Sequence, residues 1–187
     1  MSAPMPDLRG RVGMSCLIAA ESAIFTIFVV AYLFYIGKSV AGPTPAEVLR
    51  APIFLTICLL SSSVTVHSGV KALTKGDVAA FVRWWLLTLG LGAVFLAGTA
   101  VEWRRLIYVD GLTIHTNLFG TTYFSLVGLH AFHVTAGLAG LALGSILALR
   151  GHVRPIHAAR SGVFSLYWHF VDVVWVVVFL VVYVAGR

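Results

Sequence analysis

The chain has 187 residues, of which 59% are hydrophobic and only 11% are charged, and its mean hydropathy is +0.96. A soluble domain carries about 25% charged residues, so this composition excludes a water-soluble protein and indicates an integral membrane protein. The net charge of +6 does not point to nucleic acid, because basic residues in a membrane protein mostly record its orientation. We therefore expect no nucleic-acid partner.

Five apolar runs are each long enough to cross a bilayer, which takes about 20 residues. We predict an all-α fold, an integral membrane bundle of five transmembrane helices that forms a single transmembrane domain over residues 1–187. The expected helices cover residues 12–37, 51–73, 83–105, 118–149 and 161–184. The first run is too long for the apolar region of a signal peptide and contains Glu21, so we expect it to be a retained membrane helix.

Lysine and arginine are divided unevenly between the two ends of these helices. If the N-terminus is cytoplasmic, eight of the 13 basic residues lie inside and five lie outside. Because positive charge favours the cytoplasmic side, we predict a cytoplasmic N-terminus and a C-terminus outside.

Several ionisable residues interrupt the apolar runs. A charged group at the centre of a bilayer costs roughly 2.5–3.5 kcal/mol, so such residues usually face protein, water or a partner charge. His169 and Asp172 are three residues apart, which puts them on one face of a helix. Glu102 lies close to the outer end of its helix, where a side chain can reach water. The remaining ionisable residues of this kind are Glu21, His67, His130 and His133.

The helix expected over 118–149 has a stripe of small and polar residues, in steps of three and four. Its members are His130, His133, Gly137, Gly140 and Gly144. Such a stripe is typical of close helix packing, and we expect it to face His169 and Asp172. Two other interpretations are metal or haem ligation by the histidines and a proton relay. The absence of an ExxH pair disfavours the first, and the small number of such groups disfavours the second.

Segments of all five runs resemble haem-copper oxidase subunit III. The closing motif Tyr167-Trp-His-Phe-Val-Asp-Val-Val-Trp175 is the most specific of them. The other matching segments are Ala20-Glu-Ser, Ser62-Ser-Val-Thr-Val-His67, Ala100-Val-Glu-Trp103 and Phe119-Gly-Thr-Thr-Tyr-Phe with Gly128-Leu-His-Ala-Phe-His-Val. They occur in the order expected for a five-helix bacterial member of the family. Members with seven helices have two more before the first of these, so one wall of their lipid cleft has no counterpart among the five.

The resemblance implies a non-catalytic accessory subunit of a bacterial terminal oxidase, which reduces oxygen to water in aerobic respiration and pumps protons. Haem and copper are then held by subunit I, the main partner, and this chain binds no cofactor of its own. Its location is the bacterial inner membrane, where it contacts subunit I, other oxidase subunits and phospholipid.

The resemblance also assigns roles to single residues. Glu21 matches the carbodiimide-reactive carboxylate that supports proton uptake, and Arg150 matches a basic residue that contacts lipid phosphate. We interpret the remaining matches as a structural polar network inside the membrane: His67, Glu102, His130, His133, His169 and Asp172.

Three alternatives stay open at this point. One is the five-helix relative associated with nitric oxide reductase, another is a free-standing transporter or channel, and the weakest is a haem or metal enzyme. The electron donor, cytochrome c or quinol, leaves no trace in this chain because both donors dock on other subunits.

Overall fold

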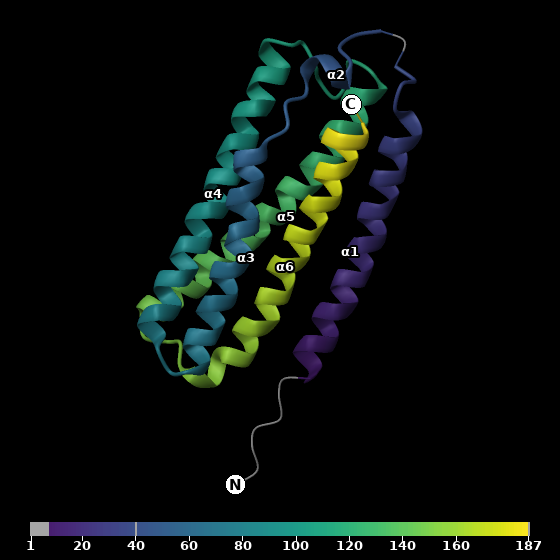
Figure 1. Cartoon of the computed structure of the whole chain (residues 1–187). Coiled ribbons are helices and arrows are strands. Elements are labelled where there is room, and N and C mark those ends of the chain that lie inside the picture. Colours follow the sequence, from purple (N-terminus) through teal and green to yellow (C-terminus); the bar gives the residue numbers. More distant parts are fainter. Residues whose placement is uncertain (1–7, 40, 187) are drawn as a thin grey trace.

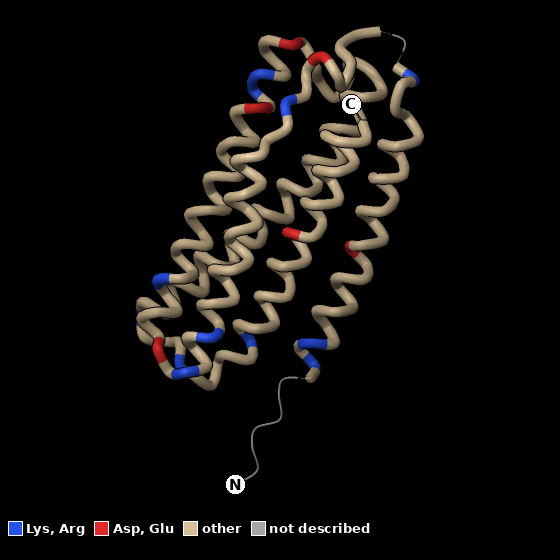
Figure 2. Tube along the Cα trace, in the orientation of Figure 1, with Lys and Arg blue, Asp and Glu red and all other residues tan. Residues whose placement is uncertain are grey.

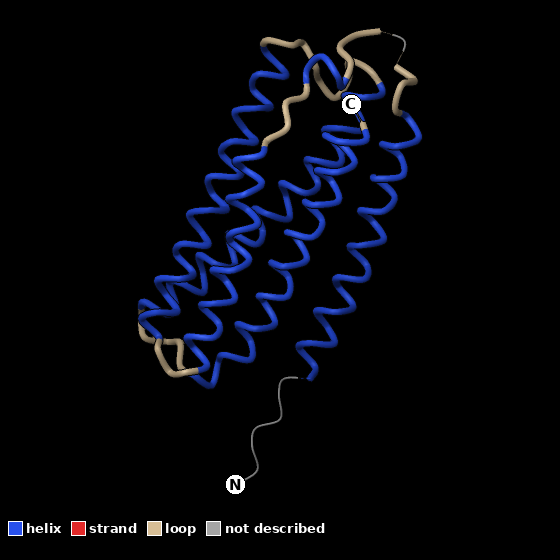
Figure 3. The backbone as a smooth tube through the Cα atoms, viewed as in Figure 1, coloured by secondary structure: helices blue, strands red, loops and turns tan. Residues whose placement is uncertain are grey.

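The computed structural model describes residues 8–39 and 41–186, and every regular element in this part of the chain is a helix (Figure 3). The long helices are α1 (Leu8–Tyr35), α3 (Ile53–Thr74), α4 (Val78–Tyr108), α5 (Leu118–Leu149) and α6 (Ala158–Phe179). A π-helical segment, η2 (Leu180–Ala185), continues α6, and two short elements, α2 (Pro45–Val48) and η1 (Pro155–His157), lie in the connections. The five long helices are long and apolar enough to cross a membrane. The predicted fold class is therefore confirmed.

The five helices run side by side along one axis (Figure 1). The hairpin of α3 and α4 packs against α5 and α6, and α1 lies at the edge, against α5 and α6. Only Phe25 and Tyr32 of α1 are buried. Helix α1 consequently leaves most of its surface to lipid or to another subunit.

Capping residues set the ends of two helices. Helix α4 begins at Val78 rather than at residue 83, because the Asp77 side chain accepts a hydrogen bond of 2.8 Å from the Ala80 backbone N–H. In the same way Asn117 caps the first turn of α5 through the Gly120 N–H. A side-chain acceptor at this position satisfies a backbone donor that the helix itself leaves free. Helix α4 therefore extends beyond its apolar run, whereas α5 begins at Leu118 as predicted.

Two tryptophans of the closing motif hold α6 against α3. Trp168 and Trp175 are at most 1% exposed. The ring N–H of Trp168 donates to Ser62 Oγ at 2.8 Å, and that of Trp175 donates to Thr56 Oγ1 at 3.0 Å. Each indole thus fills the core and satisfies its one polar atom.

The glycine stripe of α5 accommodates aromatic rings. A Cβ atom on Gly137 would lie 2.6 Å from Cζ3 of Trp168, and one on Gly140 would overlap the Phe164 ring. Gly144 makes room for the ring of Trp85 from α4 in the same way. The stripe therefore receives side chains of two neighbouring helices, and it does not bring another helix backbone close.

Charged residues gather at the two ends of the bundle (Figure 2). The exceptions are one acidic position at mid-height on α1 and one on α6 (Figure 2), and the only acidic residues of these helices are Glu21 and Asp172. Each of these carboxylates needs a partner inside the membrane.

Candidate functional site

The partner of Glu21 is His133. Its Nε2 atom lies 3.1 Å from Glu21 Oε2, which joins the middle of α1 to α5. The two side chains are 23% and 8% exposed, in the order Glu21 and His133. We name this contact the Glu21–His133 pair.

The hydrogen bonds around His133 limit the roles of its two ring nitrogens. His133 Nδ1 lies 2.8 Å from the Leu129 carbonyl oxygen, which can only accept, so Nδ1 carries a hydrogen. Nε2 then either accepts a hydrogen bond from a neutral Glu21 carboxyl or donates one to a carboxylate. In both arrangements a single proton lies between the two groups and the pair is electrically neutral. Neutrality removes most of the cost of placing these groups in a membrane.

Aromatic residues enclose the pair. The Phe25 ring is centred 5.0 Å from the His133 ring, and the Tyr167 hydroxyl of α6 donates to the His133 backbone oxygen at 3.0 Å. The site therefore joins three helices, α1, α5 and α6.

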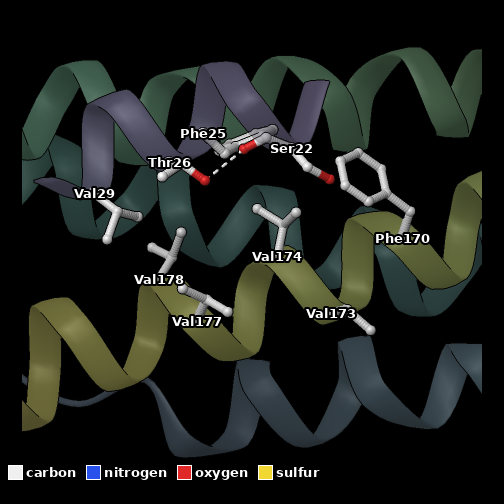
Figure 4. A pocket seen from close by; sticks show the side chains of 9 residues that line it. All are labelled: Ser22, Phe25, Thr26, Val29, Phe170, Val173, Val174, Val177 and Val178. Carbon is white, nitrogen blue, oxygen red and sulfur yellow. Dashed lines mark hydrogen bonds between the residues drawn. The ribbon is translucent and has the colours of Figure 1, made fainter. Parts of the chain in front are cut away.

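Next to Glu21 an apolar groove of about 230 Å³ lies between α1 and α6 (Figure 4). The residues that line it are Ser22, Phe25, Thr26, Val29, Phe170, Val173, Val174, Val177 and Val178. The Ser22 and Thr26 hydroxyls bond to carbonyls of their own helix, so the groove presents an apolar surface.

A second polar cluster joins α6 to α3. The Ser63 hydroxyl donates to Asp172 Oδ2 and lies 2.9 Å from His169 Nδ1. Ser165 lies 3.2 Å from the other ring nitrogen of His169. Asp172 is 3% exposed, and its Oδ1 atom has no hydrogen-bond partner among residues 8–39 and 41–186.

This arrangement corrects the expected partners of His169 and Asp172. We expected the stripe of α5 to face them, but His133 points to Glu21 and the pair on α6 is bonded to Ser63. The reason is that the aromatic rings of α6 fill the stripe of α5, so the polar residues His169 and Asp172 of α6 face α3 instead.

Of the other predicted residues, His130 lies one turn before His133 on α5, and His67 is close enough to His169 to interact with it electrostatically. His130 is fully buried and stacks on the Trp175 ring, and neither of its ring nitrogens has a partner in the described part of the chain. Glu102 lies 3.5 Å from the Tyr183 hydroxyl. His67 and Arg150 are both exposed. The grouping of these residues as one structural polar network stays a prediction.

Sequence reasoning missed three partners of these groups: Ser63, Ser165 and Tyr167. Ser165 lies four residues before His169, so helical spacing could have indicated it. Ser63 is 106 residues from His169, and no local pattern reveals such a contact.

We also looked for a place that could hold a metal ion. In the described part of the chain no group of three or more His, Cys, Asp or Glu side chains could do so.

Comparisons with known proteins agree with the motifs of the sequence. Residues 9–187 match the family model of cytochrome c oxidase subunit III. The chain is 41% identical to cytochrome c oxidase subunit 3 of Synechocystis sp. over 186 residues, which cover 95% of this chain and 76% of the relative. It is 34% identical to cytochrome c oxidase subunit 3 of Thermostichus vulcanus, over 97% of this chain and 90% of the relative. It is 42% identical to cytochrome c oxidase subunit 3 of Corynebacterium diphtheriae, over 69% of this chain and 62% of the relative.

Proposed function

Because the chain belongs to the cytochrome c oxidase subunit III family, we propose that it acts as a non-catalytic subunit that stabilises subunit I and supports its proton uptake. In this proposal haem and copper reside in subunit I. The names of the relatives favour an oxidase over a nitric oxide reductase. The observation that carries the proposal is the Glu21–His133 pair. It contains a partly exposed carboxylate at mid-membrane on the edge helix α1.

The internal bonding of the polar groups supports an accessory role. Glu21 is bonded to His133, and Asp172 and His169 are bonded to Ser63. Groups that bond to one another in this way join helices.

The proton content of the Glu21–His133 pair supports a role in proton handling. A carboxyl and an imidazole at hydrogen-bond distance can share a proton, which lies on either group. When the proton is on Glu21, the neutral carboxyl is the form that reacts with a carbodiimide.

The oxidase complex, purified in mild detergent, provides the test. We expect an apolar carbodiimide to modify Glu21, and Glu21→Gln to abolish this labelling and to lower turnover or shorten the catalytic lifetime. Glu47→Gln is the matched control, because Glu47 is an exposed acidic residue outside the five long helices. Unchanged turnover and lifetime in Glu21→Gln would remove the proposed role of this residue.

The same purification tests the partner. We expect subunit I, recognised by its haem spectrum, to co-purify with the chain. Proton flux through liposomes that contain only this chain would instead support a free-standing transporter.

We propose a location in the bacterial plasma membrane, with the start of α1 and the connections α3–α4 and α5–α6 on the cytoplasmic side. The support is the excess of Lys and Arg at that end, as the positive-inside rule requires. A membrane-impermeant thiol reagent tests it, since a cysteine in place of Lys38 should react from outside the cell and one in place of Lys75 should not.

We further propose that the end of the bundle that contains Arg150 binds phospholipid. Arg150 is exposed there, directly after α5. A pocket of about 400 Å³ at the same end has His152, His157 and Arg160 among its lining residues and continues along Gly140 and Gly144. Cationic groups above an apolar groove suit a phosphate with an attached acyl chain.

A further inference from the structure

A histidine on the outward side of α3 has no hydrogen-bond partner in the described part of the chain. His67 is exposed, and its side chain makes no hydrogen bond among residues 8–39 and 41–186. Helix α3 has 22 residues, which at 1.5 Å per residue make about 33 Å, little more than the hydrocarbon core of a bilayer. His67 lies seven residues before Thr74, the last residue of α3, and therefore about 10 Å inside that end. An exposed imidazole thus lies at the depth of the hydrocarbon.

The imidazole of His169, by contrast, is satisfied within the bundle. It is close enough to His67 to interact with it electrostatically, but its two ring nitrogens already have Ser63 and Ser165 as partners. Because the Ser63 hydroxyl donates its single hydrogen to Asp172, it accepts one from His169 Nδ1. None of these bonds includes His67, which is left as the unpartnered histidine at the contact of α3 with α6.

The exposed neighbours of His67 on its own helix offer it no acceptor. The Ser68 hydroxyl donates to the Val64 carbonyl at 2.8 Å. Lys71 is exposed one turn further along α3, and an ammonium group can only donate. Helix α3 has no acidic residue, and the single one of α6, Asp172, is 3% exposed. The outward surface of these two helices is therefore basic around His67 and has no exposed carboxylate.

The rest of the outward face of α3 is apolar. Its exposed large side chains are Ile53, Phe54, Ile57, Leu60 and Val64. Helix α6 packs beside α3 (Figure 1) and adds Val173, which is 62% exposed and lies one turn after His169. Lipid chains could cover these apolar side chains, but they offer nothing to an imidazole. A helix that packs here can satisfy both, because helices in membranes associate through packing and interhelical hydrogen bonds.

We propose that a transmembrane helix of another oxidase subunit docks on this face and places an Asp or Glu side chain against His67. A carboxylate is the complement because the exposed ionisable groups here, His67 and Lys71, are both basic, and it accepts the hydrogen bond that an imidazole N–H donates. Paired in this way, neither group faces hydrocarbon alone. This docking rests on the proposed role as an oxidase subunit, and it specifies which face is used and what the partner supplies.

A photo-crosslinking residue in place of Val64 identifies the occupant in the intact oxidase complex. Val64 is 67% exposed and lies three residues before His67, on the same face of α3. The complex that carries p-benzoylphenylalanine at this position is illuminated, and mass spectrometry identifies what is attached. We expect a transmembrane segment of another subunit with an Asp or Glu about one turn from the attached residue. A segment without such a residue, a second copy of this chain, or lipid alone would overturn the proposal.

The rate at which the chain dissociates from the complex in detergent tests the hydrogen bond. His67→Leu should accelerate dissociation at least tenfold, because a hydrogen bond to a charged group contributes about that much. The chain itself should still fold, since the His67 side chain makes no hydrogen bond within its described part. His115→Leu is the matched control, because it removes an exposed imidazole from the connection between α4 and α5 and should leave the rate unchanged. Equal acceleration by both variants would overturn a specific contact at His67.

Replacement of the partner's carboxylate by an apolar side chain completes a double-mutant cycle. It should accelerate dissociation of the unmodified chain but should not accelerate it further after His67→Leu, because the two groups form one contact. Additive effects would overturn the pairing. A chain that never co-purifies with a haem-containing subunit would refute the proposed function, whereas a chain that co-purifies but fails the test at Val64 would refute this docking face alone.

Discussion

The contact between Gly137 and Trp168 allows the stability of the bundle to be tested with a single methyl group. Gly137→Ala would place its Cβ 2.6 Å from Cζ3 and 2.8 Å from Cε3 of the Trp168 ring. That ring is fully buried, and its N–H is bonded to Ser62. The ring can move away only by breaking this hydrogen bond and displacing its neighbours.

The expected cost follows from these contacts. Overpacking a well-packed core costs about 1–3 kcal/mol, and loss of the hydrogen bond from Trp168 to Ser62 adds about 1 kcal/mol. The higher helix propensity of alanine offsets about 1 kcal/mol. We therefore expect Gly137→Ala to destabilise the chain by about 1–3 kcal/mol. Gly90→Ala is the matched control, because nothing lies within 4 Å of its new Cβ, and it should be neutral or stabilising.

The assay uses the two cysteines of the chain. Cys58 is buried and Cys16 is exposed, so in a Cys16→Ser background a thiol-reactive dye labels the chain only when α3 opens. Labelling at 20.1 kDa is followed in gels while sodium dodecyl sulfate is added to the purified complex. The midpoint should fall for Gly137→Ala relative to Gly90→Ala. Equal midpoints would refute the argument that the glycine exists to accommodate the Trp168 ring.

Three further predictions concern polar contacts. Asp172→Ala should cost about 1 kcal/mol by removing the hydrogen bond from Ser63, because the Ser63 hydroxyl still has His169 Nδ1 within reach. It should lower the amount of chain recovered in the complex, whereas Asp172→Asn should retain more, and normal recovery of both would contradict this. Trp175→Phe should keep the ring packing but lose the bond to Thr56, at a cost of about 1 kcal/mol, seen as a lower midpoint in the thiol assay. The hydrogen bond from the Thr44 backbone N–H lowers the pKa of the Glu47 carboxyl. The stabilisation from this bond is therefore present above the ordinary carboxyl pKa and is lost as the pH falls through the lowered value. Exchange of the Thr44 amide hydrogen should accelerate in that pH range, and an exchange rate that Glu47→Gln leaves unchanged would argue against this role.

The five helices could be predicted because an apolar run of bilayer length has few alternatives in a membrane. The start of α4 was harder, since its cap Asp77 lies in a polar segment that reads equally well as a loop, whereas the bounds of α5 match the prediction. The pairing of Glu21 with His133 depends on how α1 packs on α5, and the two residues are 112 positions apart. A residue's own helix does not encode such a partner.

The glycine stripe of α5 is a second case in which the sequence of one helix did not reveal its contact partner. The spacing of the stripe predicted a close contact on α5, but a small residue indicates only that a large group packs against it. Whether a backbone, an aromatic ring or a lipid chain fills the space is decided by the facing helix. The rings came from Phe164 and from Trp168, and the resemblance had associated Trp168 with the closing motif and not with this stripe.

The filling of this stripe by α6 has a consequence for the order of biosynthesis. A membrane chain enters the bilayer from its N-terminal side, so α5 reaches the membrane before Trp168 and Phe164 have been made. Until then the notches at Gly137 and Gly140 are open to lipid, and Ser63 lacks the acceptor that α6 brings. Insertion of the last helix closes these gaps together. A ribosome that stops before residue 158 therefore releases four helices with an unfilled seam.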